Sequence, residues 1–189
     1  MINFLYKKRV FLGFLFGFAY LIFAKPASLG MLISGITLGV VGETIRLIAS
    51  GYIIKTDELA TYGPYAYIRH PLYLGSFIMG LGMCLALFSS FFPLHAFIFT
   101  ATYLVFFFSV YIPVLKKEEA VLIEKYQDEY LNYKSTVPML FPLQLKKYAS
   151  KTAKKFDKKT FLNNKEYQAL SGLLLIIAIL IIKYNMVIV

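Results

Sequence analysis

Two charged residues, Glu43 and Arg46, interrupt an otherwise apolar run over residues 29–54. Charges inside a membrane helix are costly, so they usually face the interior of the bundle, where they pair or line a polar site. Their i, i+3 spacing places both side chains on one helical face. Two interpretations stay open: a salt bridge that only holds helices together, and a site at which Arg46 binds an anionic group of a substrate or cofactor.

A second polar cluster, residues 58–75, combines turn formers, tyrosines and an Arg-His pair. Pro71 suits the first turn of a helix, where its missing N–H is not needed. His70 then lies at the helix N-terminus, where free N–H groups and the helix dipole favour an anion. Tyr65 and Tyr73 are candidates to stack on an adenine or face a sulfonium cation. An aromatic belt at the membrane boundary is the alternative interpretation.

A third polar element is the pair Glu118-Glu119, which follows two lysines at the end of an apolar run. Adjacent carboxylates point to different faces of a helix. One is therefore available to an amino or ribose group, and the other to Arg69 or Arg46. The alternative is that both are simply solvated.

Other candidate sites are weaker. Gly80-Leu81-Gly82 indicates close helix packing more than a phosphate loop. The single cysteine, Cys84, excludes an intramolecular disulfide and is interpreted as a packing residue in an apolar run. One cysteine and two histidines argue against a zinc site, so we expect no metal.

Lipid-embedded helices must position these residues. The chain is 59% hydrophobic with a mean hydropathy of +0.66, whereas soluble domains are about 45–50% apolar. We predict an all-α, multi-pass transmembrane helical bundle of about five membrane helices. The apolar runs that would form them are residues 10–24, 29–54, 72–88, 92–115 and 169–182.

The net charge of +10 predicts orientation and partners. Seventeen of the twenty lysines and arginines lie in the N-terminal segment, residues 55–71 and residues 116–165. The positive-inside rule therefore predicts a cytoplasmic N-terminus and an external C-terminus. Because the basic residues lie between apolar runs, we expect anionic membrane lipids as partners and no nucleic acid.

The charge pattern also divides the chain. We predict a membrane core over residues 1–145, a basic interfacial linker over 146–167 and an additional C-terminal transmembrane helix over 168–189. Lysines recur every three or four residues in the linker, which is typical of a helix lying on anionic lipid; binding of a specific partner is the alternative. These lysines are Lys147, Lys151, Lys154, Lys155 and Lys158.

The chain resembles the isoprenylcysteine carboxyl methyltransferase family, and the related membrane phospholipid methyltransferases share the general plan. The resemblance covers roughly residues 34–142 and implies a helical membrane enzyme with an S-adenosyl-L-methionine pocket at the cytoplasmic face. The motifs that carry it, in the family's order, are Gly63-Pro64-Tyr65, Arg69-His70-Pro71-Leu72-Tyr73-Leu74-Gly75, Glu118-Glu119 and Glu129-Tyr130-x-x-Tyr133 followed by Val137-Pro138.

Carried over position by position, the resemblance implies a set of cofactor-binding residues: Glu58, Leu59, Ala60, Tyr65, His70, Pro71, Leu72, Tyr73 and Glu118. We place Arg46, Arg69 and Glu119 in the catalytic set, with Arg46 holding the substrate head group. Glu119 or His70 would be the base if the acceptor were an amine. Eukaryotic prenylcysteine enzymes of the family carry an arginine four residues before the first glutamate. Val114 stands there in this chain, so Arg46 or Lys117 would have to substitute.

The sequence thus predicts methyl transfer to a lipid-like or isoprenoid-bearing substrate, at a carboxylate, on the cytoplasmic face. A phospholipid amine N-methyltransferase is the alternative within the same chemistry. From other classes, a non-enzymatic membrane scaffold or a transporter using Glu43 and Arg46 stays open. The sequence shows no matched pair of interrupted helices of the kind that inverted-repeat transporters contain.

Overall fold

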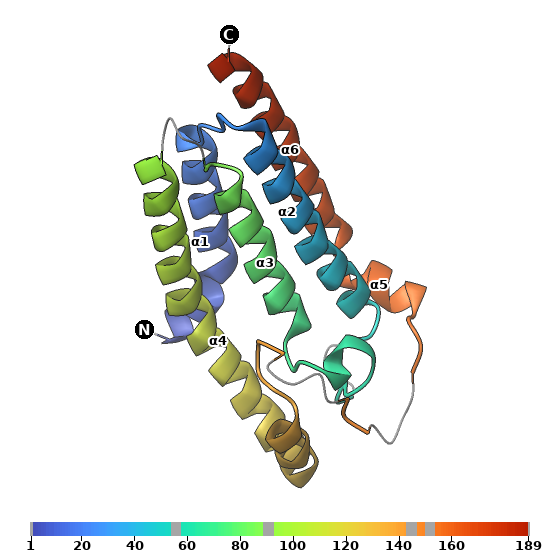
Figure 1. Cartoon of the computed structure of the whole chain (residues 1–189). Coiled ribbons are helices and arrows are strands. Elements are labelled where there is room, and N and C mark those ends of the chain that lie inside the picture. The colour runs from blue at the N-terminus through green and yellow to red at the C-terminus, as the bar shows by residue number, and fades with distance from the viewer. Residues whose placement is uncertain (1, 54–57, 89–92, 143–146, 150–153, 189) are drawn as a thin grey trace.

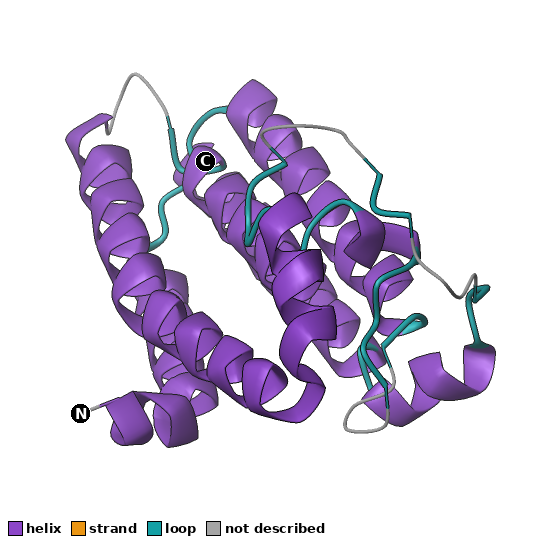
Figure 2. Cartoon of the chain, turned by 90° about the horizontal axis from the view of Figure 1, so that it is seen from below, coloured by secondary structure: helices purple, strands orange, loops and turns teal. Residues whose placement is uncertain are grey.

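The computed structural model describes residues 2–53, 58–88, 93–142, 147–149 and 154–188. Within these ranges every regular element is a helix (Figure 2), which confirms the predicted all-α class for that part of the chain. The elements are α1 (Ile2–Phe23), α2 (Leu29–Ser50), the 3₁₀ helix η1 (Gly63–Ala66), α3 (Pro71–Leu85), α4 (Pro93–Thr136), α5 (Lys158–Asn164) and α6 (Tyr167–Ile188).

The long helices lie side by side in one bundle (Figure 1). Helix α3 packs between α2 and α4, α1 packs on α4, and α6 packs on α2. At the lower end of the view, η1 and the non-helical segments gather, and α4 extends beyond the other helices. The C-terminus lies at the opposite end. Both polar segments that the sequence placed on one side of the membrane therefore occur at one end of the bundle.

Helices α2 and α3 approach so closely that their contact requires glycine on both. A Cβ atom on Gly42 would lie 2.5 Å from the carbonyl oxygen of Gly75, and one on Gly82 would lie 2.5 Å from that of Gly35. Small residues facing one another in this way are typical of tightly packed membrane helices. The close packing predicted for Gly80-Leu81-Gly82 is therefore confirmed at Gly82.

Within the described part of the chain, three helices, α2, α4 and α6, are long and apolar enough to cross a bilayer. The apolar part of α1 begins only at Phe11, and α3 has 15 residues. At 1.5 Å per residue α3 covers about 22 Å, less than the roughly 30 Å of a hydrocarbon core. Length and composition thus support three spans by themselves, and a topology of five membrane helices stays a prediction.

Element α4 covers 44 residues and joins the fourth apolar run to the polar segment that follows, as two helices that meet at a kink. Gln127 departs from helical geometry, with φ 44° and ψ −121°. Beyond this kink, Tyr130 and Tyr133 are buried against Leu59 and Val137. These tyrosines therefore form a small core at the polar end of the bundle.

The basic helical stripe predicted for the linker is wrong over the described residues. Residues 147–149 and 154–157 are not helical, and the short helix α5 begins only at Lys158. Lys151 lies outside the described residues.

Hydrogen bonds to other parts of the chain explain this departure from the lysine spacing. The Tyr148 N–H donates to the Ala66 carbonyl over 2.9 Å, and the Asp157 N–H donates to that of Gly51 over 3.0 Å. The Asp157 carboxylate then caps α5 by accepting from the Thr160 N–H at 2.7 Å. The backbone before Asp157 is thus engaged outside any helix.

Helix α6 is anchored to the rest of the bundle at both ends. Near its start, Leu173 is buried in a core cluster that also contains Leu32 of α2. Near its end, the Lys183 ammonium donates to the carbonyl oxygens of Ile22 and Ala24, at 3.0 and 3.1 Å. The predicted division at residues 145 and 167 stays a prediction, but α6 packs directly on the helices of the core.

We expect the Gly42→Ala substitution to lower the free energy of unfolding by about 1–3 kcal/mol, because the new methyl group meets the backbone of α3. Thermal unfolding of the detergent-purified chain, followed by circular dichroism, measures the change. Gly172→Ala is the matched control, since a Cβ at Gly172 has no neighbour within 4 Å. Equal stability of the two variants would contradict the close contact.

Candidate functional site

Arg69 and Glu119 form a buried ion pair between the segment that leads into α3 and the polar half of α4. The Arg69 Nε donates to Glu119 Oε1 over 2.8 Å, and Nη2 lies 2.7 Å from the same oxygen. The Lys134 ammonium lies 2.9 Å from Oε2, and His70 Nε2 lies 3.4 Å from Oε1. The side chains of Arg69 and Glu119 are only 7% and 3% exposed. Of the two arginines considered for this carboxylate, Arg69 is the partner.

The same arginine fixes the end of α4 against the start of α3. Its Nη1 donates to the carbonyl oxygens of Lys134 and Val137, at 2.9 and 2.6 Å. The N–H of Arg69 donates to the Pro138 carbonyl over 2.9 Å. Burial would raise the pKa of Glu119, but the nearby His70 ring, the Lys134 ammonium and the Arg69 guanidinium lower it to about 2. Glu119 is therefore ionised at neutral pH.

Glu118 faces a different set of partners, as expected for adjacent residues on a helix. The Tyr73 hydroxyl donates to Glu118 Oε1 over 2.6 Å. The Tyr73 ring lies 6.0 Å from the His70 ring and 5.5 Å from the Tyr111 ring, centroid to centroid. His70, Tyr73 and Glu118, three of the predicted cofactor residues, are thus brought together across α3 and α4.

Tyr65 brings together a second part of the predicted cofactor set. Its ring and Ala60 are buried with Ala49, and Leu72 packs against them. The Tyr65 carbonyl accepts from the Tyr133 hydroxyl at 2.6 Å. Pro71, also in the predicted set, is fully buried at the start of α3.

Three buried side-chain atoms of this region have no hydrogen-bond partner among the described residues: the Tyr65 hydroxyl, the Tyr130 hydroxyl and His70 Nε2, which lies 3.4 Å from Glu119 Oε1. Buried polar groups are nearly always hydrogen-bonded in native structures. Unpaired donors or acceptors in a predicted cofactor site therefore fit a bound polar molecule such as a nucleoside.

Glu58 and Leu59 lie on the outer side of this region. The Tyr62 hydroxyl donates to Glu58 Oε1 over 2.5 Å, and the Lys154 ammonium pairs with Oε2. These hydrogen bonds, that of Lys154 first, lower the pKa of Glu58. Leu59 packs instead beside Tyr130, in the cluster beyond the α4 kink. Leu59 therefore belongs to a cluster other than that of Ala60 and Tyr65.

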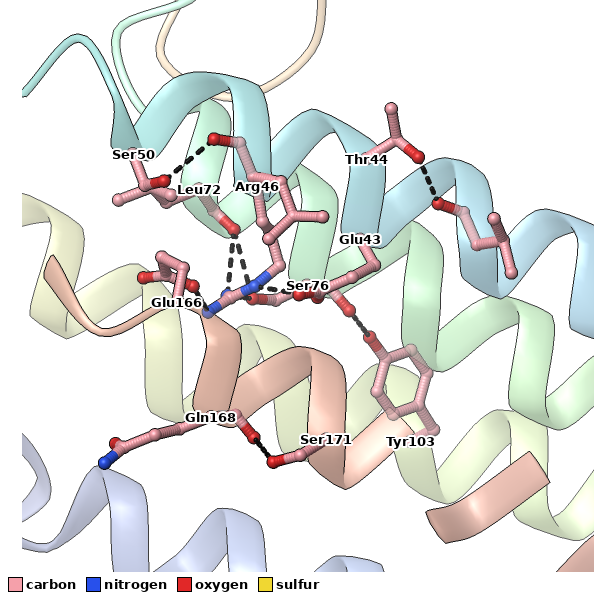
Figure 3. Close-up of polar contacts among 12 residues, drawn as sticks. Glu43, Thr44, Arg46, Ser50, Leu72, Ser76, Tyr103, Glu166, Gln168 and Ser171 are labelled. Atoms are coloured by element: carbon pink, nitrogen blue, oxygen red, sulfur yellow. Dashed lines mark hydrogen bonds and ion pairs between the residues drawn. The ribbon is translucent and has the colours of Figure 1, made fainter. Parts of the chain in front are cut away.

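The Arg46 side chain extends from α2 toward α3 and the start of α6 (Figure 3). Its Nε is 3.4 Å from Glu43 Oε2, so the predicted salt bridge is confirmed. Nη1 donates to the Leu72 carbonyl over 3.3 Å and also to the Ser76 hydroxyl. Nη2 donates to Glu166 Oε2 over 2.5 Å. Through Leu72, Arg46 is connected to the Tyr65 cluster.

Sequence reasoning did not identify three charged residues that form ion pairs in this region: Lys134, Lys154 and Glu166. Neither lysine has a spacing that relates it to a glutamate more than ten residues away. Glu166 carried a signal, because it is the only acidic residue after Asp157 and directly precedes an apolar run.

Val114 stands where the family resemblance implies an arginine, and its side chain is fully buried. Lys117, one of the two proposed substitutes, instead lines an open hollow on α4 with Ile112, Pro113 and Lys116. Within the described ranges, no group of three or more histidine, cysteine, aspartate or glutamate residues has an arrangement that would hold a metal ion.

Comparison with known proteins gives a family match. The model of the isoprenylcysteine carboxyl methyltransferase (ICMT) family matches residues 28–124, just over half of the chain. That range contains α2, η1, α3 and both glutamates of the 118–119 pair. No solved structure matches the chain significantly.

Three curated relatives are similar over most of this chain. The protein-S-isoprenylcysteine O-methyltransferase of Schizosaccharomyces pombe is 28% identical over 70% of this chain and 55% of its own length. The protein of the same name from Rattus norvegicus is 28% identical over 58% and 40%. A nickel-cobalt-cadmium resistance protein of Alcaligenes xylosoxydans xylosoxydans is 35% identical over 63% and 51%. The chain spans about half the length of these relatives.

We expect Glu119→Gln to lower the free energy of unfolding at pH 7 by about 3 kcal/mol, because it leaves the buried Arg69 without a counter-charge. Glu124→Gln, at an exposed position of α4, is the matched control. Chemical denaturation in detergent measures both variants.

The Arg69–Glu119 ion pair also predicts that the free energy of unfolding depends on pH. The pKa of Glu119 falls from its usual 4.5 to about 2 in the folded chain. Its stabilisation is therefore complete above about pH 4.5 and is lost as the pH falls toward 2. The difference in free energy of unfolding between wild type and Glu119→Gln should therefore shrink as the pH falls from about 4.5 to about 2. A constant difference between the two from pH 5 to pH 2 would refute the assignment.

Proposed function

The chain belongs to the isoprenylcysteine carboxyl methyltransferase family, and on that premise we propose that it transfers a methyl group from S-adenosyl-L-methionine to a carboxylate. The acceptor is a lipid-like or isoprenoid-bearing molecule, methylated at the cytoplasmic face of a membrane. The observation that supports this proposal most is that two buried polar atoms, the Tyr65 hydroxyl and His70 Nε2, lack a hydrogen bond within the described residues and belong to the set that the family resemblance implies for the cofactor.

The residues present fit the proposed cofactor. When bound, S-adenosyl-L-methionine supplies a methyl group already activated by its sulfonium charge. Glu118, held by the Tyr73 hydroxyl, offers a carboxylate oxygen to an amino or ribose group. The Tyr65 hydroxyl and His70 Nε2 offer further polar contacts, and the rings of Tyr73 and Tyr111 supply an aromatic wall. Glu58, Leu59, Ala60, Pro71 and Leu72 complete the proposed set.

The state of Glu119 weakens one of the two candidate bases for an amine acceptor and leaves His70 as the other. A carboxylate needs no general base, whereas an ammonium group must first lose a proton. A general base is most effective when its pKa is near the operating pH. Glu119, with its pKa lowered to about 2 and its oxygens held by Arg69 and Lys134, is a poor base. We therefore assign Arg69 and Glu119 as positioning residues that hold His70 and α4 in place.

Arg46 is the proposed clamp for the acceptor's anionic group. It lies one hydrogen bond from Leu72, a residue of the proposed cofactor set. Its side chain is 17% exposed, so it is not sealed in the bundle. A guanidinium at this place binds and orients a carboxylate without supplying or removing a proton.

We place the protein in a membrane with five helices, α1, α2, α3, α4 and α6, and with the N-terminus in the cytoplasm. Three apolar helices and the gathering of the polar segments at one end of the bundle support this topology. Residues 1–145 then form the core, residues 146–167 a basic segment facing anionic lipid, and residues 168–189 an added membrane helix.

We expect the detergent-purified chain to bind S-adenosyl-L-methionine in calorimetry, and Tyr73→Phe to weaken binding roughly tenfold by releasing Glu118. Tyr184→Phe, near the far end of α6, is the matched control and should bind like wild type. Absence of binding in a folded sample, or equal binding by the two variants, would count against the cofactor site.

The chemistry of the product tests the acceptor. With labelled cofactor and N-acetyl-S-farnesylcysteine, we expect product whose label is released as methanol in mild alkali, since that is the behaviour of a methyl ester. Transfer to phosphatidylethanolamine vesicles, with a label that resists alkali, would instead show an amine methyltransferase. Wild type with labelled cofactor and no acceptor is the control for label released from other sources.

A further inference from the structure

The segment that follows α4 runs along the connector between α2 and α3. We call its described residues, 147–149 and 154–166, the C-terminal strap. Along the connector, the Tyr148 N–H donates to Ala66 and the Asp157 N–H to Gly51. The Asn164 side chain then donates to the carbonyl oxygens of Ser50 and Ile53, at 2.8 and 2.9 Å. The family match ends at residue 124, so the strap lies outside the part that the family model covers.

The strap ends on the proposed acceptor clamp. Glu166 Oε2 lies 2.5 Å from Nη2 of Arg46. The remaining nitrogens of Arg46 face Ser76, the Leu72 carbonyl and Glu43. Both terminal nitrogens of this guanidinium thus donate hydrogen bonds, whereas Nε lies 3.4 Å from Glu43 Oε2 without one, so a carboxylate that binds at Nη2 competes with Glu166.

Of these partners, Glu166 is the one that an acceptor can replace. Glu43 is carried by the same helix as Arg46 and its side chain is 2% exposed. Ser76 and Leu72 belong to α3, whose backbone is fixed against α2 by the glycine contact. Glu166 comes from a different part of the chain, as the last residue of the strap, and its side chain is 11% exposed.

The exchange keeps the charge around Arg46 the same, because it replaces one carboxylate by another. The cluster contains two carboxylates, Glu43 and Glu166, for one guanidinium. When an acceptor carboxylate takes the place of Glu166, Arg46 keeps two negative partners and Glu43 stays paired. A neutral group gives no such compensation, because Arg46 would lose a charge-assisted hydrogen bond.

We propose that Glu166 is an internal competitor for the acceptor's carboxylate at Arg46. This inference rests on the proposed function. The acceptor must carry an anionic head group to displace Glu166. Methylation of that head group removes its charge, so Glu166 returns to Arg46 and the neutral ester is released. Glu166 thereby determines which head groups bind and favours departure of the product.

The test is calorimetric binding of N-acetyl-S-farnesylcysteine and of its methyl ester to the full chain in detergent. We expect Glu166→Gln to tighten binding of the acid roughly tenfold, since a charged competitor is replaced by a neutral one, and to leave ester binding within about twofold. Glu124→Gln, an exposed change of the same charge, should alter neither. Unchanged or weaker acid binding by Glu166→Gln, or an equal gain for acid and ester, overturns the proposal.

Two further measurements separate this inference from the proposed function. In an Arg46→Gln background, Glu166→Gln should have no further effect on acid binding; a persisting tenfold gain would show that Glu166 acts elsewhere. Circular dichroism confirms that each variant is folded. S-adenosyl-L-methionine binding on the same samples decides the methyltransferase assignment, whereas the difference between acid and ester decides the role of Glu166.

Discussion

The backbone contact between α2 and α3 determines where most other groups lie. Glycines at facing positions let the two helices approach until no Cβ atom would fit between them. At this distance the Arg46 side chain of α2 reaches the Leu72 carbonyl and Ser76 on α3. In lipid, such packing replaces the hydrophobic effect as the source of helix association, because lipid tails are as apolar as the helix surface. The polar cluster around Arg46 therefore depends on this close helix contact, in which the Arg46 stem itself packs against Gly75.

A second constraint organises the polar end of the bundle. Arg69 pairs with Glu119 and also binds two carbonyl groups at the end of α4. A buried ion pair with its remaining hydrogen-bonding capacity satisfied is rigid, and breaking it leaves a costly lone charge. The kink at Gln127 turns the last part of α4 back so that Lys134 reaches the same carboxylate. His70 and Tyr73, on the adjoining turn of α3, are consequently held at fixed distances from Glu118 and Glu119.

The two clusters have different proposed roles, one in binding the methyl donor and the other in binding the acceptor. Glu118, Tyr73, His70 and Tyr65 surround the region assigned to the methyl donor. Arg46, with Glu43 and Glu166, forms the region assigned to the acceptor. Leu72 belongs to both, since its side chain packs on Tyr65 and its carbonyl accepts from Arg46. Leu72 therefore links the two proposed regions, and direct transfer requires that donor and acceptor meet there at about 3–3.5 Å.

Much of this protein follows from its sequence alone. Composition and apolar runs predicted the helical class, and the i, i+3 spacing of Glu43 and Arg46 predicted their salt bridge. Adjacency of Glu118 and Glu119 predicted that they face different partners, and the motif order predicted the family. These features are local, or are fixed by the period of a helix, so residue spacing is enough to find them.

Tertiary structure decided the rest. The basic linker is not a regular helix, because its backbone bonds to Ala66 and Gly51, residues that its own spacing does not reveal. Lys134 and Glu166 find their partners only after the kink in α4 and the path of the strap have brought distant segments together. The sequence determined the helices, the motifs and the family. The fold alone decided which charges meet, because contacts across more than a hundred residues depend on how helices pack and not on the order of their residues.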